Sequence, residues 1–514
     1  MKHLSLSQLL EKAARENPDK EALYDGQRRL TYRELDREAA RLAHALAARG
    51  VQKGDRVAVT LPNWHETVVI YFALSKIGAI AVPFNPMYRQ HEVQHILGNS
   101  GARMLFVCED FERNMGAAAI PKSVEEVFAV RFRKDGLAAY EDLIAQGDPD
   151  ALAPVSVDPA EDVFCVLYTS GTTSAPKGAM LTHRNIVSAG VTVGEVMHCH
   201  GEDVFLIAAP IFHVFGMCPN LISAVAAQAK MVLMDKYHPR KALEWIQAEK
   251  VTVHNAVPTM YIKEVNEPDV TKFDLSSLRV GMTGGAACPA ETLKAVKEIM
   301  KMRVSTGYGL TEAPSLMNTL YDDEDRHILE TVGKALPGTE IRIVNEKRET
   351  LPPGEVGEIA CKGPTVMKGY YKDPEQTAKA LDEDGWFYTG DLGTMDENGY
   401  IRFVGRIKEV IIRGGYNIYP REIEELLYRH PKVLEAAVIG VPDQVLGEKV
   451  CAVIRLKEGM ASSKEEILSY LEPLLARYKL PEMVEFVDAF PMTGSGKIQK
   501  HRLKDIMAEK FGIS

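Results

Sequence analysis

Residues 163–178 read VFCVLYTSGTTSAPKG and join a hydrophobic run to a loop rich in hydroxyl side chains. The run 163–168 has the pattern of a buried strand. The loop that follows contains serine and threonine hydroxyls, two glycines and Lys177. Glycine lets backbone N–H groups turn towards an anion, and hydroxyls add further donors. The stretch therefore predicts a phosphate-binding loop at the end of a strand, where open α/β sheets place their ligands.

Helical and strand patterns alternate on both sides of this loop. Residues 30–50 predict a helix in which Thr31 and Glu34 form a capping box and Gly50 ends the helix. A strand pattern follows at 55–62 and a helical pattern at 64–78. Alternation of this kind predicts parallel sheets with crossover helices.

The pattern changes near residue 340 and again near residue 405. Residues 338–364 alternate apolar and polar positions between prolines and glycines, which predicts antiparallel hairpins or a small barrel-like region. From residue 405 a fresh α+β pattern begins. We therefore expect an α/β protein with a large N-terminal domain of parallel α/β subdomains (1–404). A small, mobile α+β C-terminal domain (405–514) should follow.

Composition limits the class of protein. A chain of 514 residues is too long for one hydrophobic core, and 46% hydrophobic with 26% charged residues is an ordinary globular balance. The net charge of −10 argues against a nucleic-acid partner. Seven cysteines stand singly, which indicates a reducing compartment without disulfides. No signal-type or membrane-spanning segment is apparent, so a cytoplasmic location is expected.

Five different motifs follow one another along the chain. Their order and spacing resemble those of the adenylate-forming superfamily. This family includes acyl- and aryl-CoA synthetases, peptide-synthetase adenylation domains and firefly-type luciferases. The motifs are YTSGTTSAPKG (168–178), GYGLTE (307–312), YTGDLG (388–393), GRIKEVIIRGGYNIYP (405–420) and TGSGKIQK (493–500). The resemblance implies that a small-molecule carboxylic acid reacts with ATP to give an acyl-adenylate and pyrophosphate. A thiol, expected to be that of coenzyme A, then displaces AMP.

The resemblance also implies which residues bind the nucleotide. The phosphate cradle would comprise Thr169, Ser170, Gly171, Thr172, Thr173 and Lys177. Ser174 departs from the family, which usually has glycine there, and serine restricts the loop's φ angles.

Further nucleotide residues come from the later motifs. Tyr308 would pack on adenine between Gly307 and Gly309, and Thr311 would contact phosphate. Glu312 would hold Mg²⁺, a hard ion suited to one carboxylate plus phosphate oxygens. Asp391 and Arg406 would contact the ribose.

Catalysis needs a cation between two anionic reactants, the carboxylate and the α-phosphate. Lys497 resembles that cation, and Thr169 and Glu312 would act with it. For the thiol step the resemblance implies rotation of the C-terminal domain about Lys408. Gly414, Gly415 and Tyr416 would then line the pantetheine path.

Substrate choice should depend on an acyl pocket beside His213, the position of the family's gate. The expected wall comprises Gly216, Met217, Val257, Pro258, Gly284, Gly285 and Ala286. Gly285 and Ala286 are also assigned to the nucleotide site. Small and apolar residues favour a hydrophobic acid, so a medium- or long-chain fatty acid is expected and a cinnamate- or benzoate-type aryl acid is the alternative.

Other classes fit the sequence less well. A phosphotransferase would release ADP, but Walker and kinase motifs are missing. A nucleotide-binding protein without catalysis would not need Lys497 and Glu312. A peptide-synthetase domain would carry an aspartate near His213, and an acyl-AMP ligase loading a carrier protein would have an insertion near the domain junction. The oligomeric state is open between monomer and homodimer.

Overall fold

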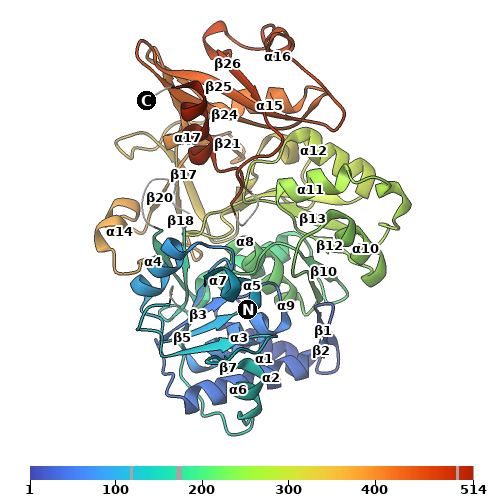
Figure 1. Ribbon diagram of the computed structural model, residues 1–514, viewed down its shortest axis with the longest axis vertical. Coiled ribbons are helices and arrows are strands. Elements are labelled where there is room, and N and C mark those ends of the chain that lie inside the picture. Colours follow the sequence, from blue (N-terminus) through green and yellow to red (C-terminus); the bar gives the residue numbers. More distant parts are fainter. Residues whose placement is uncertain (116–119, 170–175, 494–496, 513–514) are drawn as a thin grey trace.

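The computed structural model describes residues 1–115, 120–169, 176–493 and 497–512. Figure 1 shows the N-terminal subdomains at one end of an elongated molecule and the segments after residue 405 at the other. Among the described residues, no helix combines the length and apolarity needed to cross a bilayer.

The strands on either side of the phosphate motif belong to one large sheet, which has the order β19-β9-β8-β4-β3-β5-β6-β7. Its strands are β3 (Arg56–Thr60), β4 (Ile80–Pro83), β5 (Met104–Val107), β6 (Glu126–Ala129), β7 (Ala138–Ala139), β8 (Val163–Tyr168), β9 (Gly178–Thr182) and β19 (Gly369–Tyr370). The pairs from β8 to β7 are parallel, whereas β8 and β9 form an antiparallel hairpin. The phosphate motif therefore connects two neighbouring strands of one sheet.

A second large sheet has the order β16-β15-β14-β13-β12-β10-β11-β1-β2. Its strands are β1 (Glu21–Tyr24), β2 (Arg29–Thr31), β10 (Val204–Ile207), β11 (Lys230–Leu233), β12 (Val253–His254), β13 (Val280–Thr283), β14 (Arg303–Tyr308), β15 (Met317–Asn318) and β16 (Lys334–Ala335). The central pairs are parallel and both edges are antiparallel.

Helices fill the space between these sheets and cover their outer faces. The helices before residue 405 are α1 (Leu6–Glu16), α2 (Tyr32–Ala48), α3 (His65–Ile77), α4 (Gln90–Ser100), α5 (Glu109–Met115), α6 (Tyr140–Ala145), α7 (His183–Val196), α8 (Val214–Gly216), α9 (Ser223–Ala227), α10 (Pro239–Glu249), α11 (Pro258–Val265), α12 (Ala290–Ala295), α13 (Asp325–Glu330) and α14 (Pro374–Ala380). α3 contacts the first sheet, α9 contacts the second, and α7 packs on α9. Because α3 is enclosed, nearly all its residues are buried.

The predicted start of the helix over 30–50 is confirmed. Thr31 Oγ1 accepts from the Glu34 amide, and the Glu34 carboxylate accepts from the Thr31 amide. The helix ends at Ala48, and Gly50 follows at φ +80°, a conformation that glycine adopts without strain.

The predicted change near residue 340 corresponds to an antiparallel sheet of order β17-β18-β20-β21. Its strands are β17 (Glu340–Val344), β18 (Gly357–Lys362), β20 (Phe387–Met395) and β21 (Ile401–Arg406). Figure 1 shows this sheet between the large sheets and the C-terminal part of the chain. It therefore lies where the two parts meet.

The C-terminal part has its own hydrophobic clusters, formed by residues between Ile411 and Met507, whereas the main core ends at Ile401. Its elements are β22 (Ile411–Arg413), β23 (Tyr416–Ile418), β24 (Val433–Asp443), β25 (Gly447–Leu456), β26 (Met483–Phe486), α15 (Pro420–Tyr428), α16 (Lys464–Leu471) and α17 (Lys500–Phe511). The α/β class with a large N-terminal and a small α+β C-terminal domain is thus confirmed. The boundary between residues 404 and 405 stays a prediction.

Candidate active site

The phosphate motif is held at both ends by the β8–β9 hairpin. The amide of Thr169 donates to the carbonyl of Lys177 at 2.9 Å. Lys177 Nζ lies 4.2 Å from the centre of the Tyr370 ring, a cation–π contact. The predicted cradle residues Ser170, Gly171, Thr172 and Thr173, and the departure at Ser174, lie outside the described residues.

The GYGLTE motif begins at the end of β14 and continues into a tight turn. A Cβ on Gly309 would lie 2.5 Å from the Ser315 amide nitrogen, so only glycine fits there. Leu310 and Ala313 exchange backbone hydrogen bonds across the turn, which places Thr311 and Glu312 at its tip.

Tyr370, which lies in none of the five motifs, holds the carboxylate of Glu312. Its hydroxyl donates to Glu312 Oε1 at 2.8 Å. The Glu312 carbonyl also accepts from the Met367 amide at 2.8 Å. The only signal in the sequence was the tyrosine pair in GYYKDP (369–374), which carries no chemistry alone.

Asp391 is bound from two sides. Tyr308 donates to its Oδ2 at 2.7 Å, and Arg406 Nε lies 3.3 Å from its Oδ1. Asp391 and Arg406 are direct partners on β20 and β21. Burial raises the pKa of Asp391, while Arg406 and Tyr308 oppose that rise. The structure therefore brings three predicted nucleotide residues together.

Gly307 packs closely on its neighbouring strand. A Cβ there would lie 2.7 Å from Met282 Sδ, so glycine allows β14 to approach β13.

Lys497, which belongs to the C-terminal part of the chain, lies close to Gly285. A Cβ on Gly285 would lie 3.4 Å from Lys497 Cε and 3.9 Å from its Nζ. Burial and the Arg406 guanidinium lower the pKa of Lys497 to about 8, against the opposing effect of Asp391 and Glu312. One cation thus lies among the residues predicted to hold ribose, metal and phosphate.

His213 precedes α8, and its Nδ1 accepts a hydrogen bond of 3.2 Å from the Phe215 amide. Burial and the charge of Lys497 lower the pKa of His213 to about 3. The imidazole is therefore neutral at pH 7.

The residues of the expected acyl wall differ in their surroundings, and their role stays a prediction. Val257 is buried near Gly285, where a Cβ would lie 3.7 Å from its Cγ1, and Ala286 is exposed. Gly216 has another role, because a Cβ there would lie 2.1 Å from the Pro210 carbonyl oxygen. Close backbone packing, and not room for a substrate, requires glycine at that position.

Asn63 organises the segment before His213 and was also missed. Its side-chain nitrogen donates to the Ile207 carbonyl at 3.1 Å and the Ala209 carbonyl at 3.0 Å. Its Oδ1 accepts from the Ile211 amide at 2.9 Å. One buried amide therefore satisfies three backbone groups of an irregular segment.

The predicted hinge and pantetheine residues lie elsewhere in the C-terminal part. Lys408 is exposed in a short 3₁₀ turn, η5 (Ile407–Glu409). Gly414 and Gly415 form the β22–β23 turn, both with positive φ, and Tyr416 packs against the Tyr478 ring at 4.7 Å between centroids. Their roles stay predictions.

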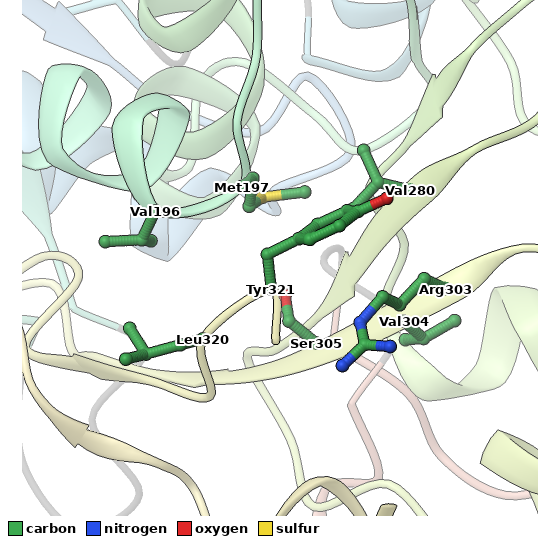
Figure 2. A pocket seen from close by; sticks show the side chains of 8 residues that line it. All are labelled: Val196, Met197, Val280, Arg303, Val304, Ser305, Leu320 and Tyr321. Carbon is green, nitrogen blue, oxygen red and sulfur yellow. The ribbon is translucent and has the colours of Figure 1, made fainter. Parts of the chain in front are cut away.

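Two cavities can be described, one away from these motifs and one beside Arg413 of the 405–420 motif. Figure 2 shows one between the end of α7 and strands β13 and β14, lined by Met197, Arg303 and Tyr321 among others. It has no room for even a water molecule, so it cannot hold an acyl group. The second is a surface hollow of about 720 Å³ beside Arg413 and Tyr478.

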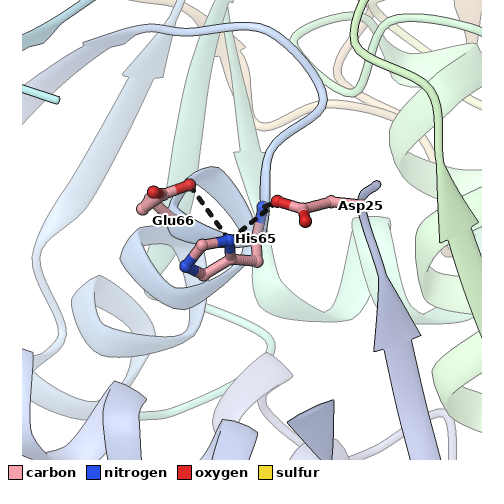
Figure 3. A group of neighbouring side chains, drawn as sticks. All are labelled: Asp25, His65 and Glu66. Carbon is pink, nitrogen blue, oxygen red and sulfur yellow. Dashed lines mark hydrogen bonds and ion pairs between the residues drawn. The ribbon is translucent and has the colours of Figure 1, made fainter. Parts of the chain in front are cut away.

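A buried group of Asp25, His65 and Glu66 resembles a metal site in composition (Figure 3). The guanidinium of Arg131, however, contacts both carboxylates and lies 3.0 Å from His65 Nδ1. A permanent cation therefore already occupies the position a metal would take. The group joins the β1–β2 turn of the second sheet to the start of α3, the helix that connects β3 and β4 of the first sheet.

Comparisons with known proteins identify the chain. The family model described as AMP-binding enzyme matches residues 10–371, and the model described as AMP-binding enzyme C-terminal domain matches residues 422–497. The chain belongs to the AMP-binding enzyme family. The predicted adenylate-forming family is thereby confirmed.

Two curated relatives and one solved structure of this AMP-binding family show its range. The chain is 36% identical to medium-chain fatty-acid–CoA ligase of Escherichia coli (strain K12), covering 98% of this chain and 90% of that one. It is 39% identical to feruloyl-CoA synthase of Amycolatopsis sp, covering 97% of each. The anthranilate CoA ligase AuaEII, solved with anthranoyl-AMP, superposes with a TM-score of 0.93 at 28% identity, covering 99% and 98%.

The AMP-binding enzyme described here is accordingly an AMP-forming acid–CoA ligase that uses ATP and coenzyme A. Its relatives act on both aliphatic and aromatic acids, so family membership leaves the acid open.

Proposed function

We propose that this ligase activates a hydrophobic carboxylic acid, a medium- or long-chain fatty acid in the first instance. The observation that carries the proposal is the pair of His213 and Lys497. His213 is neutral at pH 7, and apolar Val257 is buried beside Gly285 and Lys497. Apart from Lys497, the apolar part of a bound acid would then face no charged side chain among these residues, which favours a hydrophobic acid.

In the first half-reaction the acid's carboxylate attacks the α-phosphorus of ATP, and pyrophosphate leaves. Both reactants are anionic, so Lys497 would lower their repulsion and stabilise the charge that moves onto the phosphate oxygens. Asp391, Tyr308 and Arg406 would orient the nucleoside. Thr169 and Lys177 would hold the β- and γ-phosphates.

Glu312 suits Mg²⁺, because a single carboxylate together with phosphate oxygens is a common magnesium site in nucleotide enzymes. Tyr370 donates a 2.8 Å hydrogen bond that orients this carboxylate, and the charge of Glu312 raises the pKa of Lys497. When bound, the metal would neutralise phosphate charge.

In the second half-reaction the thiol of coenzyme A attacks the acyl carbon, and AMP leaves. We propose that the C-terminal domain turns about Lys408 between the steps. Lys497 would then leave the site, and Gly414, Gly415 and Tyr416 would line the pantetheine path.

The test is pyrophosphate release with a panel of acids from octanoate to palmitate, together with benzoate and ferulate. Each acid is assayed with and without coenzyme A, and AMP is measured as product. The highest kcat/KM for an aliphatic acid supports the proposal, whereas the highest value for ferulate or benzoate favours the aryl alternative suggested by the 39% identical relative. Activity only with an acyl carrier protein would instead favour the carrier-loading alternative.

We also propose that the enzyme is located in the cytoplasm and is a monomer or a homodimer. Light scattering after size-exclusion chromatography measures the oligomeric state.

A further inference from the structure

The first turn of α17 carries an unusual set of charges. Lys500, His501 and Arg502 open the helix, and its first turn holds no acidic residue. The positive end of the helix dipole lies there, so cations are disfavoured unless an anion compensates them. Leu503 and Met507 are buried and fix the helix on the C-terminal core.

Lys500 has two such anions. Its Nζ lies 2.8 Å from Glu424 Oε1 and 3.2 Å from Glu409 Oε2. The Lys500 side chain is only 20% exposed. Burial lowers the pKa of Lys500, but the two carboxylates outweigh burial and raise that pKa above its ordinary value. Lys500 is therefore charged at neutral pH.

Each carboxylate connects Lys500 to a different part of the molecule. Glu424 lies on α15 and also accepts from the Val438 amide of β24 at 2.7 Å, so the domain core holds it. Glu409 ends the η5 turn that contains Lys408. Lys500 is thus the residue that joins α17 to the segment entering the domain.

Glu409 also interacts electrostatically with the predicted ribose residues. Burial raises the pKa of Glu409, and Lys500 and Arg406 outweigh this and lower it. In turn, the charge of Glu409 raises the pKa of Asp391. Charges therefore alternate along the series Asp391, Arg406, Glu409 and Lys500, from the predicted ribose site to the start of α17.

Lys497 stands three residues before Lys500 on a short hairpin whose described ends are tightly paired. The Thr493 amide donates to the Lys497 carbonyl at 2.7 Å, and the Lys497 amide donates to Thr493 Oγ1 at 3.0 Å. The Gln499 amide donates to the Pro491 carbonyl at 2.8 Å. A shift of Lys500 would therefore move Lys497.

We propose that Lys500, paired with Glu409 and Glu424, is a positioning residue that places Lys497 for acyl-adenylate formation. This inference rests on the proposed role of Lys497 in the first half-reaction.

The experiment separates the two half-reactions of the full-length enzyme. Pyrophosphate release from ATP and the acid selected by the panel measures the first. Thioester formation from the chemically made acyl-adenylate and coenzyme A measures the second. Lys500→Met is expected to slow the first roughly 10- to 100-fold, mainly through kcat, since small displacements of a reacting group have effects of this order. The second half-reaction should stay within about twofold of wild type.

Two further variants serve as controls. Lys500→Arg keeps the charge and should restore most of the first half-reaction. Lys510→Met removes a lysine of the same helix that pairs with Glu485 at the far end, and both half-reactions should be unchanged.

If Lys500→Met fails to fold, Glu409→Gln tests the same inference independently. It should also slow the first half-reaction and leave the second nearly unchanged. If both variants fold, the double variant should be no slower than Lys500→Met alone, because the two residues act through one pair. Equal loss of both half-reactions, or an unchanged first half-reaction in Lys500→Met or Glu409→Gln, would overturn the inference. A wild-type enzyme that releases no pyrophosphate with any acid would instead refute the proposed function.

Discussion

The hydroxyl of Tyr308 donates a 2.7 Å hydrogen bond to Asp391, and this bond joins the end of β14 to the middle of β20. Two residues predicted to bind different parts of the nucleotide, the base and the ribose, are thereby one unit. Asp391 is only 3% exposed, so loss of either partner would leave it poorly compensated.

Tyr308→Phe keeps the ring and removes this hydrogen bond. We expect KM for ATP to rise roughly tenfold, as for a hydrogen bond to a charged group, with little change in KM for the acid. Steady-state kinetics with each substrate varied in turn measures both. The matched control is Tyr400→Phe, which removes a 2.7 Å hydrogen bond to Asp323 outside the predicted site. Equal effects of the two substitutions would contradict the assignment.

The lowered pKa of Lys497 predicts that the rate of pyrophosphate release depends on pH. Burial and Arg406 lower its pKa to about 8, so the cation is present below that pH and is lost above it. kcat/KM for ATP in pyrophosphate release should therefore be flat below about pH 8 and fall up to tenfold per unit above it. Lys497→Arg, which keeps its charge, should move the fall to higher pH at a lower overall rate. An identical profile in the two enzymes would remove Lys497 from this titration.

Tyr370→Phe tests how Glu312 is held. The ring that Lys177 contacts remains, whereas the 2.8 Å hydrogen bond to Glu312 is lost. A less well-oriented carboxylate should raise the Mg²⁺ concentration for half-maximal rate several-fold, since second-layer partners tune metal affinity. Titration of Mg²⁺ at saturating ATP measures this. Tyr388→Phe, which loses a 2.8 Å hydrogen bond to Asp382, should leave the Mg²⁺ requirement unchanged.

Asn63→Ala leaves three backbone groups before His213 without their partner. We expect KM for the acid to rise about tenfold or more while KM for ATP changes little, because His213 is the residue proposed to lie beside the acid. Asn185→Ala is the control, since that buried amide donates to the Pro364 and Val366 carbonyls instead. Both variants should lose thermal stability, but only the first should alter KM for the acid.

Arg131→Met tests the buried cluster of Figure 3. Removing a guanidinium that is only 13% exposed takes the cation away from two buried carboxylates, and the free energy of unfolding should fall by about 3–5 kcal/mol. Urea unfolding followed by circular dichroism measures the change. Arg133→Met breaks an exposed pair with Asp142 and should leave the free energy of unfolding nearly unchanged.

The same cluster should make the protein sensitive to acid. Burial alone would raise the pKa of Asp25, but hydrogen bonds from His65 and the Arg28 amide outweigh it and hold that pKa far below its ordinary value. A carboxylate with a lowered pKa contributes stability above its unfolded pKa of about 4, and that contribution declines as the pH falls further. The free energy of unfolding should therefore fall as the pH is lowered from 7 to about 3. Urea unfolding at these two pH values measures the change, and equal stability at both would contradict the role of the cluster.

The sequence by itself determined the local structure and the family. The capping box of Thr31 and Glu34 and the strand pattern at 163–168 depend on neighbours within a few residues, and both were predicted correctly. The ordered motifs indicated an adenylate-forming enzyme, and the family models agree. The sequence also named Asp391, Tyr308 and Lys497, because each lies within a motif.

Only the tertiary structure decided how these residues meet and what holds them. Tyr370 reaches Glu312 across 58 positions and Asn63 reaches Ile211 across 148, in stretches without a recognisable motif. The antiparallel return of β9 beside β8, and the approach of Lys497 to Gly285, likewise depend on how sheets and domains pack. Periodicity reports which face of an element is buried, whereas a polar contact between distant segments depends on the relative placement of both backbones.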